Sequence, residues 1–412
     1  MTKTRAMLVP AYMEEFSCIG SSCEDTCCAG WKVTIDQATY KKYNKVRSEI
    51  KPMLDKHIKR NRSGRGTENY AQIVLGPDKF CPFLNEQKLC GVQLKLGEEY
   101  LSNICVSYPR VSNIVNGVLE KSATMSCPEA ARLALLNPDG IEFNETEESV
   151  EVRNSINKRL HTATVNDGQI ERYFWELRIF SIQVLQNRNY SLAERLIFLG
   201  MFFQKAEHYL GENRLQEIPQ LIASYTAMMD GQEIGNILTD IPALAAIQME
   251  LLKNLIDQRV ISGVHSKRYL DCFGEFLHGI KYTKDDSVEE ISDRYQAAYH
   301  DYYQPFMNKH EYVLENYLVN YVYINLFPLS RDKQLFEEYI MMVIHYAMIK
   351  MHLIGMAGFH KENFSLDHVI QLIYSFSRVV EHNFSYLREV RELLRKNEYN
   401  SMAYMAILIK NN

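Results

Sequence analysis

Four cysteines stand within eleven residues near the start of the chain, in the sequence Cys18-Ile-Gly-Ser-Ser-Cys23-Glu-Asp-Thr-Cys27-Cys28. An apolar core does not need four sulfur atoms in so short a stretch, whereas thiolates are preferred ligands of zinc and of iron–sulfur clusters. The stretch therefore predicts a metal centre. It also constrains the fold, because four thiols must be held by a backbone that bends sharply around them.

Four more cysteines occur in the first 127 residues, and only Cys272 lies beyond them. The N-terminal residues lack the continuous apolar segment of a signal peptide, so we expect a cytoplasmic, reducing setting that favours thiolate–metal bonds over disulfides. Cys272 is predicted to be a buried small hydrophobe. The predicted ligand set is Cys18, Cys23, Cys27, Cys28, Cys81, Cys90, Cys105 and Cys127.

The residues around these cysteines predict a small α+β metal-binding module over residues 1–140. Asn116-Gly117 separates two alternating segments and predicts a hairpin with strands over 110–115 and 118–125. Short strands are expected over 31–35 and 71–75, and Asp36 is expected to cap a helix. Each of the four later cysteines is predicted to lie beside a turn or the end of an element.

The composition changes after this module. The acidic run from Glu142 to Glu151 predicts an exposed strand or a connector, and we place a connector at 141–167 and an all-helical domain at 168–412. Ser191 and Glu194 form a capping box at the start of one helix. The expected fold class is mainly α, with helices over 170–186, 191–210, 215–229, 242–261, 267–278, 288–303, 311–326, 333–355 and 366–384.

Charge and motifs exclude several functions. The net charge is −5, so no global basic field points to a nucleic-acid partner. The most apolar segment, 339–359, contains His345, Lys350 and His352, which favours a core helix over membrane insertion. No Gly-rich phosphate loop, Gly-x-Ser-x-Gly or Rossmann Gly-x-Gly-x-x-Gly is present, so the common hydrolase and nucleotide-binding chemistries lack support.

Two segments each have two interpretations. The basic stretch from Lys56 to Arg65 is predicted to be a loop, either gripping an acidic protein surface or simply solvated, and the solvated loop is the simpler expectation. The segment 311–325 is rich in tyrosine and asparagine. Its polar tips could line a substrate channel, or its aromatic rings could belong to the core with satisfied hydroxyls.

The chain resembles the flagellin lysine N-methylase family over most of its length. In the cysteine-rich half alone, the chain is also similar to putative zinc- or iron-chelating cysteine domains. The residues that carry the family resemblance are Phe16 to Trp31 with its four cysteines, Cys81-Pro-Phe-Leu, Leu89-Cys90, Leu96-Gly97, Leu101-Ser102, Cys105-Val-Ser-Tyr108-Pro109-Arg110, Ser126-Cys127-Pro128-Glu129, and Glu315-Asn316-Tyr317-Leu-Val-Asn320-Tyr321 through Phe327-Pro328.

This resemblance implies transfer of a methyl group from S-adenosylmethionine to surface lysines of flagellin. It also implies an iron–sulfur cluster, [4Fe–4S], held by the cysteine module, with zinc as the alternative metal. Two other classes stay open: a non-catalytic, zinc-stabilised interaction module, and an iron–sulfur redox protein without methyl transfer.

Lysine methylation needs a neutral amine in line with the methyl donor, and a tyrosine or carboxylate could take up its proton. The candidates are Tyr108, Tyr317 and Tyr321. Arg110 could pair with the carboxylate of S-adenosylmethionine or anchor the hairpin. Trp31 is expected to pack over the metal centre rather than to stack on adenine.

Overall fold

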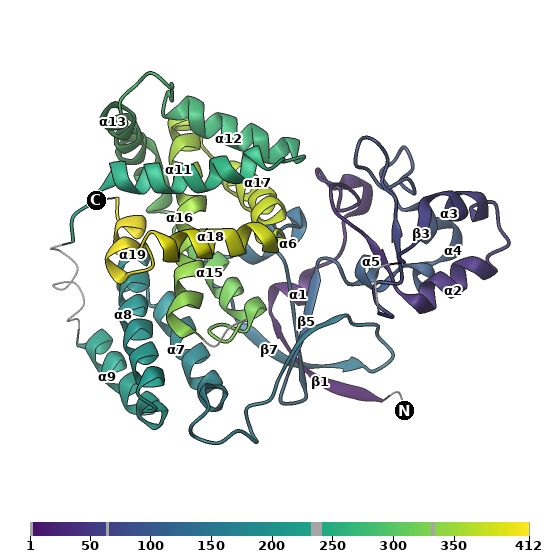
Figure 1. Ribbon diagram of the computed structural model, residues 1–412, viewed down its shortest axis with the longest axis horizontal. Helices are drawn as coiled ribbons and strands as arrows, with labels where there is room; N and C mark the ends of the chain where they lie inside the picture. Colours follow the sequence, from purple (N-terminus) through teal and green to yellow (C-terminus); the bar gives the residue numbers. More distant parts are fainter. Residues whose placement is uncertain (1–2, 63–65, 232–240, 331–333, 412) are drawn as a thin grey trace. The chain divides into compact units, whose positions relative to one another are not determined.

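The computed structural model describes residues 3–62, 66–231, 241–330 and 334–411. Helix accounts for 58% of the chain and strand for 11%, which confirms the mainly α class. The chain divides into two compact units (Figure 1). The N-terminal unit comprises Met1–Ala130 and Phe143–Arg159, and the helical unit comprises Ala131–Glu142 and Leu160–Asn412.

A five-stranded mixed sheet in the N-terminal unit has the order β7-β1-β6-β5-β8. Strand β1 pairs with β6 in parallel and with β7 antiparallel. The predicted hairpin is confirmed: Val115 pairs with Val118, and the turn residues Asn116 and Gly117 have φ of 50° and 86°, the left-handed values of a type I′ turn. The strands are β1 Thr4–Pro10, β5 Arg110–Val115, β6 Val118–Ala123, β7 Phe143–Ser149 and β8 Ile156–Leu160.

The segment expected as a connector, 141–167, contains two of these strands. The acidic run forms β7, and its Glu148 accepts hydrogen bonds from Lys121 of β6 and from Arg5 of β1, the latter at 2.6 Å. Basic neighbours thus hold the acidic strand in the sheet. Residues 131–142, expected within or beside the first module, belong to the helical unit.

The cysteine-rich part of the N-terminal unit has a three-stranded antiparallel sheet, β2-β4-β3, packed with short helices. Asp36 caps α2 as predicted, accepting from the Thr39 backbone N–H at 2.8 Å. The stretch predicted as a basic loop ends α3 and then forms β3, and its residues 63–65 lie outside the described ranges. The elements are β2 Thr34–Ile35, α2 Gln37–Lys45, α3 Lys51–His57, β3 Ile58–Arg60, β4 Ala71–Ile73, α4 Gly91–Leu96 and α5 Asn103–Ser107.

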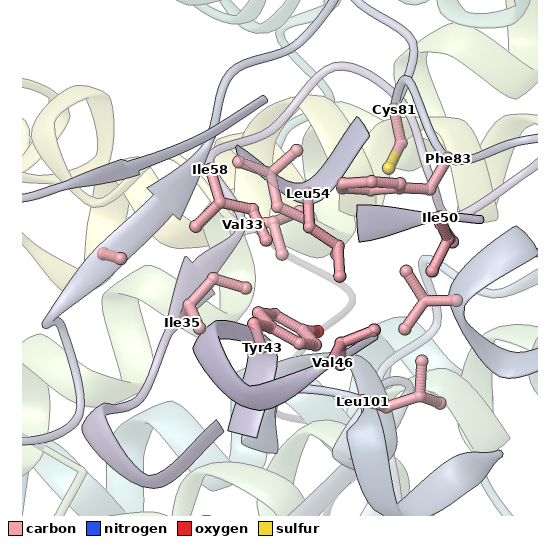
Figure 2. Close-up of a cluster of buried hydrophobic side chains, with 13 residues drawn as sticks. Val33, Ile35, Tyr43, Val46, Ile50, Leu54, Ile58, Cys81, Phe83 and Leu101 are labelled. Carbon is pink, nitrogen blue, oxygen red and sulfur yellow. The ribbon is translucent and has the colours of Figure 1, made fainter. Parts of the chain in front are cut away.

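One apolar cluster holds this part together (Figure 2). Tyr43, Val46, Ile50, Leu54 and Ile58 recur at intervals of three or four residues and are all buried. That spacing places one face of α2 and α3 on the core and leaves the other face in solvent.

Every element assigned in the described residues after Leu160 is a helix. The capping box of Ser191 and Glu194 is confirmed. Two predicted helices change winding: residues 299–303 and 377–381 are π-helical, a form often found at functional sites. Lys333, where one helix was expected to begin, lies outside the described ranges.

The α-helices of the chain outside the cysteine-rich part are α1 Tyr12–Glu15, α6 Pro128–Leu135, α7 Phe174–Gln186, α8 Leu192–Gly211, α9 Ile218–Asp230, α11 Ala245–Ile261, α12 Lys267–Gly279, α13 Val288–Ala298, α14 Gln304–Met307, α15 Tyr312–Asn325, α16 Leu335–His360, α17 Leu366–Phe376, α18 Phe384–Lys396 and α19 Met402–Ile409.

Helix α16 runs through the middle of the helical unit (Figure 1). With the turn that follows it, Leu335–Asn363 is long and apolar enough to cross a membrane, but its most apolar window is completely buried in the protein. A core helix passes the same test. Gly279 of α12 and Gly355 of α16 allow the two helices to touch through their backbones, since a Cβ on Gly279 would lie 1.7 Å from the Gly355 carbonyl oxygen.

Candidate functional site

The cysteine loops are brought together by backbone pairing between distant segments. The Cys81 amide donates to the Cys28 carbonyl at 2.8 Å, and Ala29 forms a β-bridge with Phe80. A second bridge, Leu84 with Cys90, closes the turn between the next two cysteines. These contacts bring the backbone of Cys81 to that of Cys28 and fold the chain between Cys81 and Cys90 into a turn.

The electrostatics of the thiols show the same convergence. A hydrogen bond with the Cys27 side chain, together with burial, raises the pKa of Cys28 far above its ordinary value. Burial raises the pKa of Cys81 to about 11 and that of Cys105 to about 12, and the charge of Cys90 contributes to both shifts. Each thiolate raises the pKa of its neighbours, so the joint ionisation of these thiols would be favoured by a cation bound among them.

Two further thiols lie within the field of Cys27. Burial raises the pKa of Cys127 to about 11, with contributions from the charges of Cys23 and Cys27. Burial also raises the pKa of Cys23, whose thiol donates to the Asp25 carbonyl at 3.2 Å. Cys18 is exposed. Seven of the eight predicted ligands therefore act on one another electrostatically.

The chemistry of this donor set suits a soft metal or an iron–sulfur cluster. All nine cysteines are free thiols, and Cys272 is fully buried in the helical unit, as expected for a small hydrophobe. Across the described ranges, no group of three or more His, Cys, Asp or Glu side chains is arranged so that it could hold a metal ion. Metal ligation by the eight N-terminal cysteines therefore stays a prediction.

Trp31 and Tyr108 lie beside the cysteine loops. The Trp31 indole N–H donates to the Cys27 carbonyl at 2.6 Å, and the Trp31 and Tyr108 ring centroids are 5.8 Å apart. The Tyr108 hydroxyl is 3.0 Å from the Ser126 hydroxyl, next to Cys127 in the sequence. Trp31 thus packs on the cysteine stretch, and Tyr108 joins the first cysteine stretch to the last cysteine.

Arg110 stacks its guanidinium on the Phe16 ring, 4.9 Å from the centroid. Phe16 is buried and precedes Cys18 by two residues. This contact ties the start of β5 to the cysteine stretch, which is the anchoring role considered for Arg110. Its pairing with S-adenosylmethionine stays a prediction.

The other tyrosine candidates lie on α15 in the helical unit. The Tyr317 hydroxyl donates to Glu381 Oε1 at 2.5 Å, and Ser377 donates to Glu381 Oε2 at 2.6 Å. Burial and the Glu381 carboxylate raise the pKa of Tyr317 well above its ordinary value. Tyr317 is therefore a protonated donor, a buried aromatic with a satisfied hydroxyl, and the carboxylate of the pair is the acceptor.

Glu381 was not recognised in the sequence. It follows Tyr317 by 64 residues and ends the second π-helical segment, so no local motif connects the two. Tyr321, one turn after Tyr317, has its ring centroid 5.4 Å from that of His345. His345 and His352 are both buried in α16, and each donates Nδ1–H to the carbonyl four residues earlier, as expected of core histidines.

Glu315 and Asn316, which precede Tyr317 in the same motif, have structural partners. Glu315 is 1% exposed and accepts from Arg188 at 2.8 Å and Arg195 at 2.7 Å. The Asn316 amide donates to the Asn137 carbonyl at 2.8 Å. These contacts fix α15 to α8, to the turn between α7 and α8, and to the turn after α6, so this part of the motif orients the helix.

Fold and site together define a class: a mainly helical protein in which a thiol-rich N-terminal unit precedes a helical unit with a polar α15. Residues 178–408, more than half of the chain, match the FliB lysine N-methylase C-terminal domain. The chain belongs to the FliB lysine N-methylase family.

Relatives extend this match to the N-terminal unit. The chain is 26% identical over 386 residues to proteins named Lysine-N-methylase from Salmonella typhimurium and Salmonella choleraesuis, covering 91% of this chain and of each relative. It is 38% identical over 140 residues to the flagellar biosynthetic protein FliU of Salmonella muenchen, covering 33% of this chain and 80% of the relative. No solved structure matches the chain significantly.

Proposed function

We propose that this protein is an S-adenosylmethionine-dependent methyltransferase that acts in the cytoplasm on lysine side chains of flagellin. The observation that carries the proposal is the family match over the helical unit, extended to nearly the whole chain by relatives named Lysine-N-methylase. The flagellar name of a third relative supports a flagellar substrate.

The proposed cofactor is a [4Fe–4S] cluster, and the donor set supports it. Once bound, such a cluster offers an iron that can coordinate the amino and carboxylate groups of S-adenosylmethionine, or an electron for its activation. The residues that would hold the cluster are four of the eight N-terminal cysteines. Seven of these influence one another electrostatically and are the first candidates: Cys23, Cys27, Cys28, Cys81, Cys90, Cys105 and Cys127.

The protein's own groups have to orient the substrate amine and accept its proton. Tyr317 holds its proton, so its role in this proposal is to orient Glu381 by hydrogen bonding, with the carboxylate as the acceptor. Tyr108 is held by Ser126 beside the thiols, where it can orient a bound donor molecule. Tyr321 remains a candidate for contact with the substrate amine.

Metal analysis separates this proposal from its alternatives. Anaerobically purified protein is expected to be brown and to contain iron with acid-labile sulfide, lost in Cys28→Ser and retained in Cys272→Ala. Cys272 is the matched control, because it is a buried free thiol in the other unit. Colourless protein with stoichiometric zinc would instead support a zinc-stabilised interaction module.

Activity is tested with purified flagellin and S-adenosylmethionine, with flagellin lysines read by mass spectrometry. Methylated lysines are expected with the wild-type protein. A cluster-loaded protein that leaves flagellin unmodified would favour an iron–sulfur redox protein. If Tyr317→Phe and Glu381→Gln both retain the wild-type rate, the assignment of this pair is wrong.

A further inference from the structure

A cluster of buried tyrosines surrounds Lys350 in the helical unit. Tyr299 and Tyr303 begin and end the first π-helical segment, and their ring centroids are 5.6 Å apart. Tyr346 lies one turn before Lys350 on α16. The Lys350 ammonium is 5.6 Å from the Tyr299 ring centroid and 5.8 Å from that of Tyr346. The proposed methyl transfer uses none of these four buried residues.

The hydroxyls of these three tyrosines differ from those of other buried tyrosines. Within the described residues, the hydroxyls of Tyr299, Tyr303 and Tyr346 form no hydrogen bond. By contrast, the Tyr339 hydroxyl donates to the Leu196 carbonyl at 2.9 Å. Buried polar groups are normally hydrogen-bonded. Three unpartnered hydroxyls in one cluster therefore indicate contact with a polar group from outside the chain.

The cations next to these hydroxyls are also incompletely paired. Lys350 donates to the Ile409 carbonyl at 2.9 Å, and in the part of the chain that the structure describes it has no other hydrogen bond and no ion pair. Arg195, which is 3% exposed, binds Glu311 and Glu315 with its terminal nitrogens, but its Nε–H is buried without a partner. A buried lysine without a paired anion is rare, because its desolvation is not offset. These donors therefore suit an anion.

Glu311 supplies an acceptor and a route from the surface. Its Oε2 accepts from Arg195 at 2.8 Å, whereas its Oε1 has no partner among residues 3–62, 66–231, 241–330 and 334–411. The side chain is 40% exposed, so the cluster reaches the surface here. Burial raises the pKa of Tyr303 and that of Tyr346 well above their ordinary values, and the charge of Glu311 adds to both shifts. The carboxylate therefore lies close to these hydroxyls, which are protonated donors.

This combination of groups selects a ligand that carries a carboxylate and an amino group together. A carboxylate can accept from the Lys350 ammonium and from the tyrosine hydroxyls, and an amino group can donate to Glu311 Oε1. A purely anionic ligand would meet the Glu311 carboxylate, and a purely cationic ligand would meet Lys350. Only a ligand with both groups complements both charges.

We propose that Lys350, the three tyrosines and Glu311 form a binding site for an α-amino-acid group. Two sources offer this chemistry: a free amino acid such as methionine, and the methionine part of S-adenosylmethionine. The first source goes beyond the proposed function, and the second rests on it. The site lies entirely in the helical unit, so the thiols of the N-terminal unit do not form it.

The test measures binding to the full-length protein by isothermal titration calorimetry. The probes are L-methionine and S-adenosylhomocysteine, which carries the same amino-acid group as the methyl donor without the reactive methyl. The test variants, Tyr303→Phe and Tyr346→Phe, each remove one hydroxyl and keep the ring. Tyr339→Phe is the matched control, because its buried hydroxyl is already bonded to Leu196. Since the two test hydroxyls have no partner in the fold, their loss should leave thermal stability unchanged, whereas the control should lose stability.

We expect the Kd of at least one probe to rise about tenfold or more in both test variants and to keep its wild-type value in the control. A change for L-methionine alone assigns the site to a free amino acid. A change for S-adenosylhomocysteine assigns it to the methyl donor, and the KM for S-adenosylmethionine in the methylation assay should then rise as well.

Kd values that are the same in wild type and in both test variants would overturn the site. The absence of binding of both probes would overturn it too, as would an equal loss of binding in Tyr339→Phe. The proposed function fails separately: a protein that binds L-methionine through these tyrosines but leaves flagellin unmodified refutes the methylase alone. Flagellin methylation together with unaltered binding of both probes in Tyr346→Phe and Tyr303→Phe refutes the site alone.

Discussion

The buried side chain of Lys350 is expected to make the free energy of unfolding depend on pH. It lies in the middle of α16 with 6% of its surface exposed, and its Nζ donates to the Ile409 carbonyl of α19 at 2.9 Å. The rings of Tyr299 and Tyr346 lie 5.6 and 5.8 Å from the ammonium. Burial lowers the pKa of Lys350 from 10.5 to about 7, against an opposing contribution from Glu311.

The sign follows from proton binding. Between pH 7 and 10.5 the unfolded chain binds the Lys350 proton and the folded chain has lost it, so the free energy of unfolding rises with pH in this window. At about 1.4 kcal/mol per pKa unit, the lowered pKa of Lys350 reduces the free energy of unfolding by roughly 5 kcal/mol below pH 7. About 2 kcal/mol of this reduction is expected to disappear between pH 7 and pH 9.

The Lys350→Met variant isolates this contribution. It keeps a long side chain and removes the titrating group. Loss of the hydrogen bond to Ile409 leaves a buried carbonyl at a cost of about 1–3 kcal/mol, but that cost does not depend on pH. Wild type is therefore expected to gain about 2 kcal/mol relative to Lys350→Met between pH 7 and pH 9.

The measurement is chemical denaturation followed by circular dichroism at a series of pH values for both proteins. Lys309→Met is the control, since Lys309 is exposed and its loss should leave the pH dependence at the wild-type slope. Parallel stability curves for wild type and Lys350→Met would show that Lys350 has the same pKa folded and unfolded. The reasoning from burial would then be wrong.

Two further predictions concern packing and buried charge. Gly279→Ala should destabilise the helical unit by roughly 3 kcal/mol or more in the same denaturation assay, because the new Cβ collides with the Gly355 backbone. The control is Gly274→Ala in the same helix, which should cost nothing because its Cβ meets open space. Glu315→Gln should lower the free energy of unfolding by roughly 3 kcal/mol, since Arg188 and Arg195 lose their buried carboxylate. Glu217→Gln, which changes a partly exposed ion pair with Arg214, should cost less than about 1 kcal/mol, and equal effects of the two substitutions would refute the argument.

The features predicted correctly from the sequence depend on neighbours in the chain. Asn116-Gly117 forms its hairpin because both residues tolerate left-handed backbone, and Ser191 with Glu194 caps a helix across three residues. The 3.6-residue spacing of apolar positions located most of the helical unit. In each case the stabilising contact lies within a few residues, so the local sequence contains all of its parts.

The prediction of a basic loop was wrong because the contact that orders this stretch comes from outside the local sequence. Its residues 58–60 form β3 because β4 lies beside them, with Ile58 opposite Ile73, and a pairing of this kind depends on a segment that the local pattern does not show. The acidic run was likewise ambiguous until β1 and Lys121 gave it partners. Tertiary pairing decided both cases over local propensity.

The sequence by itself determined the mainly helical class, the concentration of thiols at the N-terminal end and the family resemblance, because composition, periodicity and motif are properties of the chain. Only the tertiary structure decided which groups meet. It brought the Cys81 amide to the Cys28 carbonyl and gave Tyr317 the carboxylate of Glu381. Such contacts join residues far apart in the chain, and their energies depend on burial and distance, which exist only after folding.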